Sequence, residues 1–133
     1  MTMKKIIILL VFSTTMTNAS KTGQELLNIC HDYNTYLLSN TMLKYDSSGI
    51  QEKNVVECIS YIQGVIDMND FLSNFVENYD TPACIPYDNS VTSDDIYSAV
   101  YLYLKNNQES IKQPAATLIS NALTEKYSCS KSG

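Results

Sequence analysis

The sequence contains no arginine, no tryptophan and a single histidine among its 133 residues. All nine cations are lysines, so the chain lacks the arginine fork that recognises phosphate or guanine through two hydrogen bonds. Fourteen Asp and Glu residues outnumber these lysines, and the clustered cations that a nucleic-acid backbone requires are missing. We therefore expect no nucleic acid among the partners of this protein.

Glycine and proline are also scarce, with four and three residues. This scarcity excludes collagen, linker arrays and low-complexity chains. A hydrophobic content of 44% is too high for intrinsic disorder, and 133 residues suit one domain rather than several. The composition therefore predicts one small folded domain.

Long apolar runs are scarce too, and the clearest one lies near the N-terminus. Lys4 and Lys5 precede the apolar run 6–12, and small polar residues follow it up to Ala19. This order is typical of a secretory signal peptide, whereas a membrane span needs about 20 apolar residues. We predict a signal peptide over 1–19; an uncleaved anchor and a buried strand are the alternatives.

Removal of the signal peptide leaves a domain of residues 20–133 that is clearly acidic. It carries 7 Lys against 14 acids, a net charge of −7. We expect it in the periplasm, with no membrane association after cleavage. An acidic surface favours a basic partner, although acidity also serves simply to keep a small exported protein soluble.

The domain contains four cysteines, Cys30, Cys58, Cys84 and Cys129. None forms a C-x-x-C pair, and His31 is the only imidazole, so the short ligand spacing of a zinc site is absent. An even cysteine count in a small exported chain favours two disulfides. We expect no metal and no cofactor.

Apolar residues recur at helical spacing in four stretches, which predicts an all-α fold: a small disulfide-stapled bundle of about four helices. The expected helices cover 23–39, 51–79, a stretch from the cap Thr92 to a stop at Asn106-Asn107, and 114–127.

Local signals set the ends of these helices. Thr22 and Glu25 have the spacing of a capping box, and Thr92 is a second N-cap. Pro82 disfavours helical geometry in the residue before it and so ends the second helix. Gly64 lies inside that helix, where we expect close approach of a neighbouring helix backbone, or alternatively a kink.

The helix order favours one pairing of the cysteines. In an antiparallel bundle, Cys30 and Cys58 face each other across the first helical hairpin. Cys84 before the third helix and Cys129 after the fourth lie at the same end of the second hairpin. We therefore prefer Cys30–Cys58 with Cys84–Cys129; Cys58–Cys84 with Cys30–Cys129 is the alternative.

Catalytic chemistry is poorly supported. No G-x-S-x-G, H-E-x-x-H, phosphate-loop or calcium-loop pattern occurs. Asp67 and Asp70 have the spacing of a carboxylate pair, but such a pair is more often a solvated helix face. We predict that His31 is exposed and that the protein is not an enzyme, unless His31 and an acid line one pocket.

The chain is rich in tyrosine, with ten residues. Exposed tyrosine beside aspartate is common in protein interfaces, and a general bias toward Tyr, Asn, Ile and Lys is the alternative explanation. We expect Tyr33, Tyr61, Tyr79, Tyr103 and Tyr127 in the core, and Tyr87, Tyr97 and Tyr101 on the less buried side around the third helix.

Several segments together resemble a known family. They are Thr22-Gly23-Gln24-Glu25-Leu26-Leu27, the C-x-x-Y-I-x-G-x-x-D run from Cys58 to Asp67, Cys84-Ile85-Pro86 and Pro114-Ala115-Ala116. Over residues 22–129, with all four cysteines in order, the chain resembles the Rap/Tai family of type VI secretion immunity proteins.

The resemblance implies an exported helical homodimer that protects a bacterium from a peptidoglycan amidase effector by occluding its active-site cleft. A small periplasmic chaperone of the acid-stress kind, opening at low pH, is the alternative function. We predict that the polar loops flanking the third helix contact the effector, although ordinary solvated loops have the same composition. The predicted contact residues are Tyr87, Asp88, Asn89, Asn107, Gln108 and Glu109.

Overall fold

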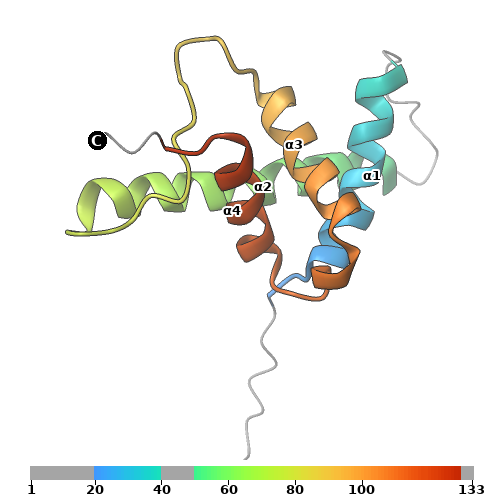
Figure 1. Ribbon diagram of the computed structural model, residues 1–133. Coiled ribbons are helices and arrows are strands. Elements are labelled where there is room, and N and C mark those ends of the chain that lie inside the picture. The colour runs from blue at the N-terminus through green and yellow to red at the C-terminus, as the bar shows by residue number, and fades with distance from the viewer. Residues whose placement is uncertain (1–19, 40–49, 130–133) are drawn as a thin grey trace, which may run out of the picture.

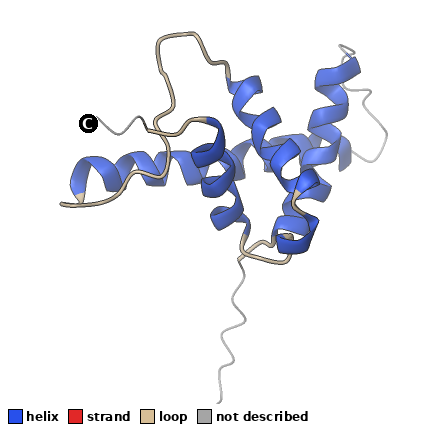
Figure 2. Ribbon diagram, in the orientation of Figure 1, coloured by secondary structure: helices blue, strands red, loops and turns tan. Residues whose placement is uncertain are grey.

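The computed structural model describes residues 20–39 and 50–129. The predicted signal peptide over 1–19 lies outside these residues. Within the described ranges the chain forms four α-helices, one 3₁₀ turn and no strand (Figures 1 and 2), which confirms the predicted all-α fold. These elements are α1 (Gly23–Ser39), α2 (Ile50–Phe75), α3 (Ser93–Asn106), η1 (Gln108–Ser110) and α4 (Ala115–Lys126).

The helices are not all antiparallel. Figure 1 shows α2 running across α1, α3 and α4, with the end of α2 extending beyond α4. Helix α1 contacts the other three, and α4 contacts α2 and α3. With 26 residues, α2 is about 39 Å long, so the other helices cover only part of it.

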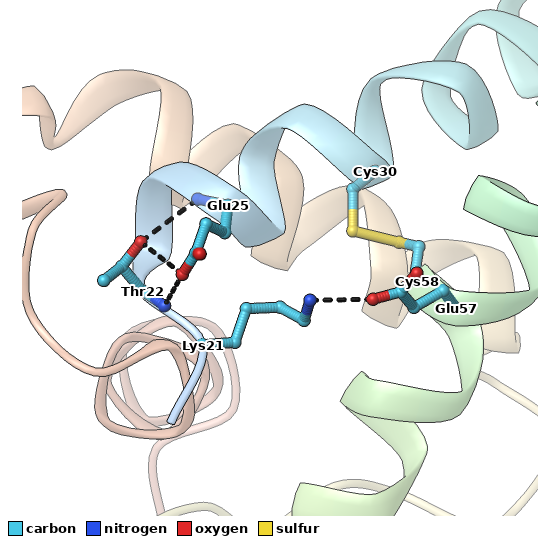
Figure 3. A network of polar contacts seen from close by, with 6 residues as sticks. All are labelled: Lys21, Thr22, Glu25, Cys30, Glu57 and Cys58. Atoms are coloured by element: carbon cyan, nitrogen blue, oxygen red, sulfur yellow. Dashed lines mark hydrogen bonds and ion pairs between the residues drawn. A yellow bond between two sulfur atoms is a disulfide. The ribbon is translucent and has the colours of Figure 1, made fainter. Parts of the chain in front are cut away.

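Both predicted N-caps are present. Glu25 N donates to Thr22 Oγ1 over 3.3 Å, and Thr22 N donates to the Glu25 carboxylate over 2.7 Å (Figure 3). These hydrogen bonds from Thr22 lower the pKa of Glu25. Thr92 and Asp95 form the same reciprocal pair at the start of α3. Each box satisfies amide groups that have no partner within the helix.

The start of α1 is joined to the segment before α4. Gly23 N donates to Gln113 O over 2.9 Å, and Gln24 N donates to Ile111 O over 2.9 Å. A Cβ atom on Gly23 would lie 2.3 Å from Leu118 Cδ1. Gly23 is therefore the glycine that a close approach requires.

The prediction for Gly64 is wrong. No atom lies within 4 Å of a Cβ built on this residue, so no neighbouring backbone approaches it. Gly64 is exposed on α2, and the helix continues through it without interruption from Ile50 to Phe75. The sequence pattern could not distinguish a glycine at a helix crossing from one that faces open space.

All four helices contribute buried side chains to one core. Tyr33 is buried as predicted, and its ring packs edge-to-face on Tyr97 at 5.4 Å. Tyr61, Tyr103 and Tyr127 are partly buried against the core. The largest fully buried side chains are Leu26, Ile62, Leu104, Leu118, Ile119, Leu123, Val100, Cys30 and Cys58.

The prediction for two tyrosines of α3 is wrong. Tyr97 and Tyr101 are only 6% and 8% exposed, although the helical pattern predicted the less buried face. Helix α3 contacts α1 as well as α4, so two of its faces are covered. The exposed Tyr87, at 70%, agrees with the prediction.

Both preferred disulfides are present. Cys30–Cys58 joins α1 to α2 (Figure 3), and both residues are 1% exposed. Cys84–Cys129 joins the segment before α3 to the residues after α4. One disulfide therefore links the first two helices, and the other links the two ends of the segment that contains α3 and α4.

Helix α2 ends earlier than predicted. It stops at Phe75 rather than at residue 79, and Asn78 has a φ of 62°. Asparagine tolerates this left-handed conformation better than most residues, and the chain turns back at that point. Pro82 therefore lies in the extended segment that follows the turn, not at the helix end.

Candidate functional site

The negative charge of the chain is concentrated in one continuous part. Residues 54–104 contain no lysine, whereas 20–53 and 105–133 together hold seven lysines and six acids. This part is α2 from its fifth residue on, the connecting segment and most of α3. Its eight acids are Glu57, Asp67, Asp70, Glu77, Asp80, Asp88, Asp94 and Asp95.

Exposed apolar side chains gather in the same part. Of the seven large apolar residues that are exposed in the described structure, five lie between 64 and 92. We name residues 64–92, the second half of α2 with the connecting segment, the acidic arm; its α2 end projects past α4 in Figure 1. These five residues are Met68, Phe71, Phe75, Val76 and Tyr87.

Four residues of the acidic arm form a stripe along α2. Gly64, Met68, Phe71 and Phe75 recur at steps of four, three and four, which places them on one helix face. This face lies opposite the buried stripe that contains Ile62. Met68, Phe71 and Phe75 are 56%, 54% and 74% exposed, and the two phenylalanine rings are 4.8 Å apart. The stripe is therefore apolar surface that the fold itself does not use.

The connecting segment is fastened to α2 by tyrosine hydroxyl groups. Tyr79 Oη donates to Asn69 Oδ1 over 2.9 Å, and Tyr87 Oη donates to Asp70 Oδ2 over 2.7 Å. Farther along, Cys84 N donates to Tyr127 O over 2.8 Å. With the Cys84–Cys129 disulfide, these contacts hold the segment in one position along α2 and beside the end of α4.

Tyr87 combines an exposed ring with a hydroxyl that is turned toward carboxylates. Partial removal from water, the hydrogen bond to Asp70 and the negative charge of Asp70 and Asp67 raise its pKa to about 12. The hydroxyl is therefore a neutral donor at physiological pH. Asp67 also accepts a hydrogen bond from Gln63 Nε2 over 2.8 Å.

A groove borders the apolar stripe. It has a volume of about 540 Å³ and runs between α2 and α4, where Gly64, Val65 and Met68 face Ala116, Thr117 and Ser120. Because Gly64 has no side chain, the groove stays open at this point. None of its lining residues is charged. The groove is large enough for apolar side chains of a partner.

The first predicted contact loop belongs to the acidic arm. Tyr87, Asp88 and Asn89 are all exposed, and Asn89 has a φ of 66°. Ser90 donates its backbone amide and its hydroxyl to Asp88, and these bonds lower the pKa of the Asp88 carboxyl. The structure thus holds this loop in a tight turn next to Asp70.

The second predicted contact loop follows the other end of α3, which has 14 residues and is about 21 Å long. Asn107 Nδ2 donates to Tyr103 O over 2.8 Å, and Gln108 Nε2 donates to Leu104 O over 2.9 Å. Both amides cap the last carbonyls of α3, while Glu109 is exposed. Asn107 also lines a groove of about 370 Å³ between α3 and α4. The two loops therefore do not form one compact site.

The structure gives little support to catalysis. His31 is exposed, as predicted, and its Nδ1 lies 3.3 Å from Tyr101 Oη. It lines neither of the two grooves. In the ranges that the structure describes, no three His, Cys, Asp or Glu residues are grouped so that they could hold a metal ion.

The described structure thus combines an all-α fold, two disulfides and an exposed acidic arm. A comparison with protein families matches the model of the Rap1a immunity proteins to residues 22–129. The chain belongs to the Rap1a immunity protein family. No curated protein and no solved structure matches it.

Membership of the Rap1a family gives the protein an effector-immunity role and implies a cognate effector as its partner. Proteins of this family are typically exported and are not usually catalytic. In the described ranges, none of the helices has the length and apolar character that crossing a membrane requires.

Proposed function

We propose that this Rap1a protein is a periplasmic immunity protein, a homodimer that binds a type VI peptidoglycan amidase effector and inhibits it by occluding the active-site cleft. The observation that carries the proposal is the family match over residues 22–129, nearly all of the domain after the predicted signal peptide. The function requires no cofactor and no turnover.

The disulfides and the predicted signal peptide support a periplasmic location. Two disulfides close the fold, and disulfides persist in the oxidising periplasm rather than in the cytosol. The predicted signal peptide over 1–19 carries Lys4 and Lys5 before its apolar run. Cleavage after Ala19 leaves the first capping box intact, because Thr22 and Glu25 follow it.

Inhibition of an amidase is the direct test. The full chain is produced with its own N-terminus, purified from periplasmic extract, and mixed with each purified type VI peptidoglycan amidase of the source genome. We expect hydrolysis of peptidoglycan to stop at a stoichiometric ratio for one of them. Full amidase activity with all of them at saturating protein would contradict the proposal.

The contact residues are tested by charge reversal. We propose that Tyr87, Asp88 and Asn89, and Asn107, Gln108 and Glu109, face the effector. Asp88→Lys and Glu109→Lys should each weaken binding, since both carboxylates are exposed. Glu52→Lys, in the first turn of α2, is the matched control. Unchanged affinity of a variant with a wild-type circular dichroism spectrum would remove its loop from the interface.

The exposed stripe on α2 also favours the acid-stress chaperone as a second candidate. A chaperone of this kind opens at low pH, so carboxylates that stabilise the fold set the pH of opening. Hydrogen bonds with Thr22 and Thr92 lower the pKa values of Glu25 and Asp95. Caps of this kind stabilise the fold above the usual carboxyl pKa and are lost only as the pH falls through the lowered one. Suppression of aggregation of malate dehydrogenase at pH 3, without amidase inhibition, would identify a chaperone.

A further inference from the structure

We infer that the acidic arm is the anchor of the complex and that it binds a basic-rimmed apolar surface on the effector. The inference rests on the proposed function for the identity of the partner and goes beyond it in naming the surface and its chemistry. It follows from the juxtaposition of the exposed apolar side chains Met68, Phe71 and Phe75 with the carboxylates Asp67 and Asp70.

The arm has the make-up of a strong protein interface. Aromatic side chains that fill pockets supply most of the binding energy at such surfaces, and charges around them set the association rate and the choice of partner. Phe75 is 74% exposed and Phe71 is 54% exposed, so both rings are available. Asp67 and Asp70 lie on the neighbouring face of the same helix.

The charge of the arm selects the sign of the partner. Residues 64–92 carry five acids and no lysine. Two of these acids accept hydrogen bonds only from neutral groups in the described structure, Asp67 from Gln63 and Asp70 from Tyr87. Their charge is therefore not neutralised by these partners. A basic rim around an apolar depression complements this pattern.

A second copy of the chain is a poor occupant of the same surface. A two-fold dimer through the arm would bring each patch against its own copy, so that Asp67 and Asp70 approach like charges. Like charges brought together at an interface disfavour the contact. A head-to-tail contact with another face avoids this repulsion but does not close into a dimer unless the rotation is two-fold. The arm therefore fits a different, basic protein.

The arm is also held ready for binding. Two tyrosine hydroxyls fasten the connecting segment to α2, and Cys84–Cys129 fastens it beside α4. A surface that is fixed before binding loses less conformational entropy when the complex forms. The uncharged groove beside Gly64 and Met68 continues the apolar stripe toward α4.

The test measures affinity for the amidase that the wild type inhibits. Phe71→Ala with Phe75→Ala should raise the dissociation constant at least about 30-fold. Asp67→Lys should raise it about 10-fold and flatten its dependence on salt concentration. Val56→Ala, on the first half of α2 and 57% exposed, is the matched apolar control and should leave the affinity unchanged.

The outcomes separate the arm from the proposed function. Wild-type affinity of both arm variants, with the amidase still inhibited, overturns the arm and leaves the immunity function standing. If Phe71→Ala with Phe75→Ala converts a dimer to a monomer in sedimentation velocity, the arm is a self-interface and the inference is wrong.

If no amidase is inhibited, the proposed function fails and the arm is judged by a photo-crosslinking amino acid at position 75 in the periplasm of producing cells. A crosslink to one identified basic protein, lost with Asp67→Lys and absent from the same probe at position 56, supports the arm. A crosslink to a second copy, or none, overturns it.

Discussion

The two halves of α2 have similar apolar content but use it differently. The first half places Val55, Cys58 and Ile62 in the core and is joined to α1 by the Cys30–Cys58 disulfide. The second half leaves Phe71 and Phe75 exposed on the opposite face. One helix thus holds the fold together at one end and presents a surface at the other.

The difference shows how binding surface can be recognised in a helical protein. Apolar residues that stabilise a fold are covered, and their removal costs burial energy. Apolar residues that remain exposed on a fastened element contribute little to stability, and a contiguous group of them marks an interaction site. Truncation of an apolar side chain should therefore lower stability in the first half of α2 and leave it almost unchanged in the second half.

The largest expected effect contrasts Ile62 with Phe75. Ile62→Ala should lower the free energy of unfolding by about 2–5 kcal/mol, because the side chain is fully buried. Phe75→Ala should change it by less than about 0.5 kcal/mol, because the ring is already in water. Urea denaturation measures both. Equal losses for the two variants would show that the two halves do not differ.

The second prediction concerns the disulfide of the acidic arm. Cys84→Ala with Cys129→Ala should cost about 2–4 kcal/mol and loosen the segment 76–92. Amide hydrogen exchange should then rise in this segment while the first half of α2 stays protected. Mild reduction of the wild type is the control, since Cys84 is exposed and Cys30 and Cys58 are buried. Uniform loss of protection would mean that the arm and the body unfold together.

The third prediction tests the boundary between the halves. Gly64→Ala should raise the free energy of unfolding by about 0.5–1 kcal/mol, because alanine favours the helix and the new methyl group meets no atom. Gly23→Ala should lower it by about 1–3 kcal/mol, because its Cβ would lie 2.8 Å from Ile111 O. A loss of stability for Gly64→Ala would reveal a contact that the fold does not show.

The smallest effect is the pH dependence of the Tyr87–Asp70 contact. The pKa of Tyr87 is raised to about 12, so the contact stabilises the fold fully below pH 10 and is lost as the pH rises from 10 to 12. Tyr87→Phe should remove one late-titrating phenol from an absorbance titration. Asp70→Asn should lower its pKa, whereas Asp88→Asn should not. An unchanged titration in Tyr87→Phe would assign the late phenol to another tyrosine.

Local signals predicted the body of this protein well. The capping box at Thr22 and the N-cap Thr92 were predicted from local sequence, the preferred cysteine pairing was predicted from helix order, and the structure contains all of them. The end of α2 was missed because the conformation of Asn78 ends the helix before Pro82 can act. Helix starts and helix ends are both set by local sequence, but the N-cap residues were easy to recognise and the turn at Asn78 was not.

Burial was harder to predict where a helix has more than one neighbour. The pattern of α3 gave one apolar stripe, yet Tyr97 and Tyr101 are buried because α1 covers a second face. The two predicted contact loops are placed by the fold at opposite ends of α3. Their sequence distance alone did not show that only the loop at Tyr87 adjoins the exposed stripe.

The hydrogen bonds between the start of α1 and the segment before α4 also make the first helix depend on a distant part of the chain. The amides of Gly23 and Gln24 find their acceptors at Gln113 and Ile111, near the opposite end of the domain. A contact between such distant residues forms slowly and needs most of the chain to be present. The first amides of α1 therefore find these acceptors only when the segment 111–113 is present. A chain truncated before Ile111 would have every residue of the acidic arm and no completed first helix to support it.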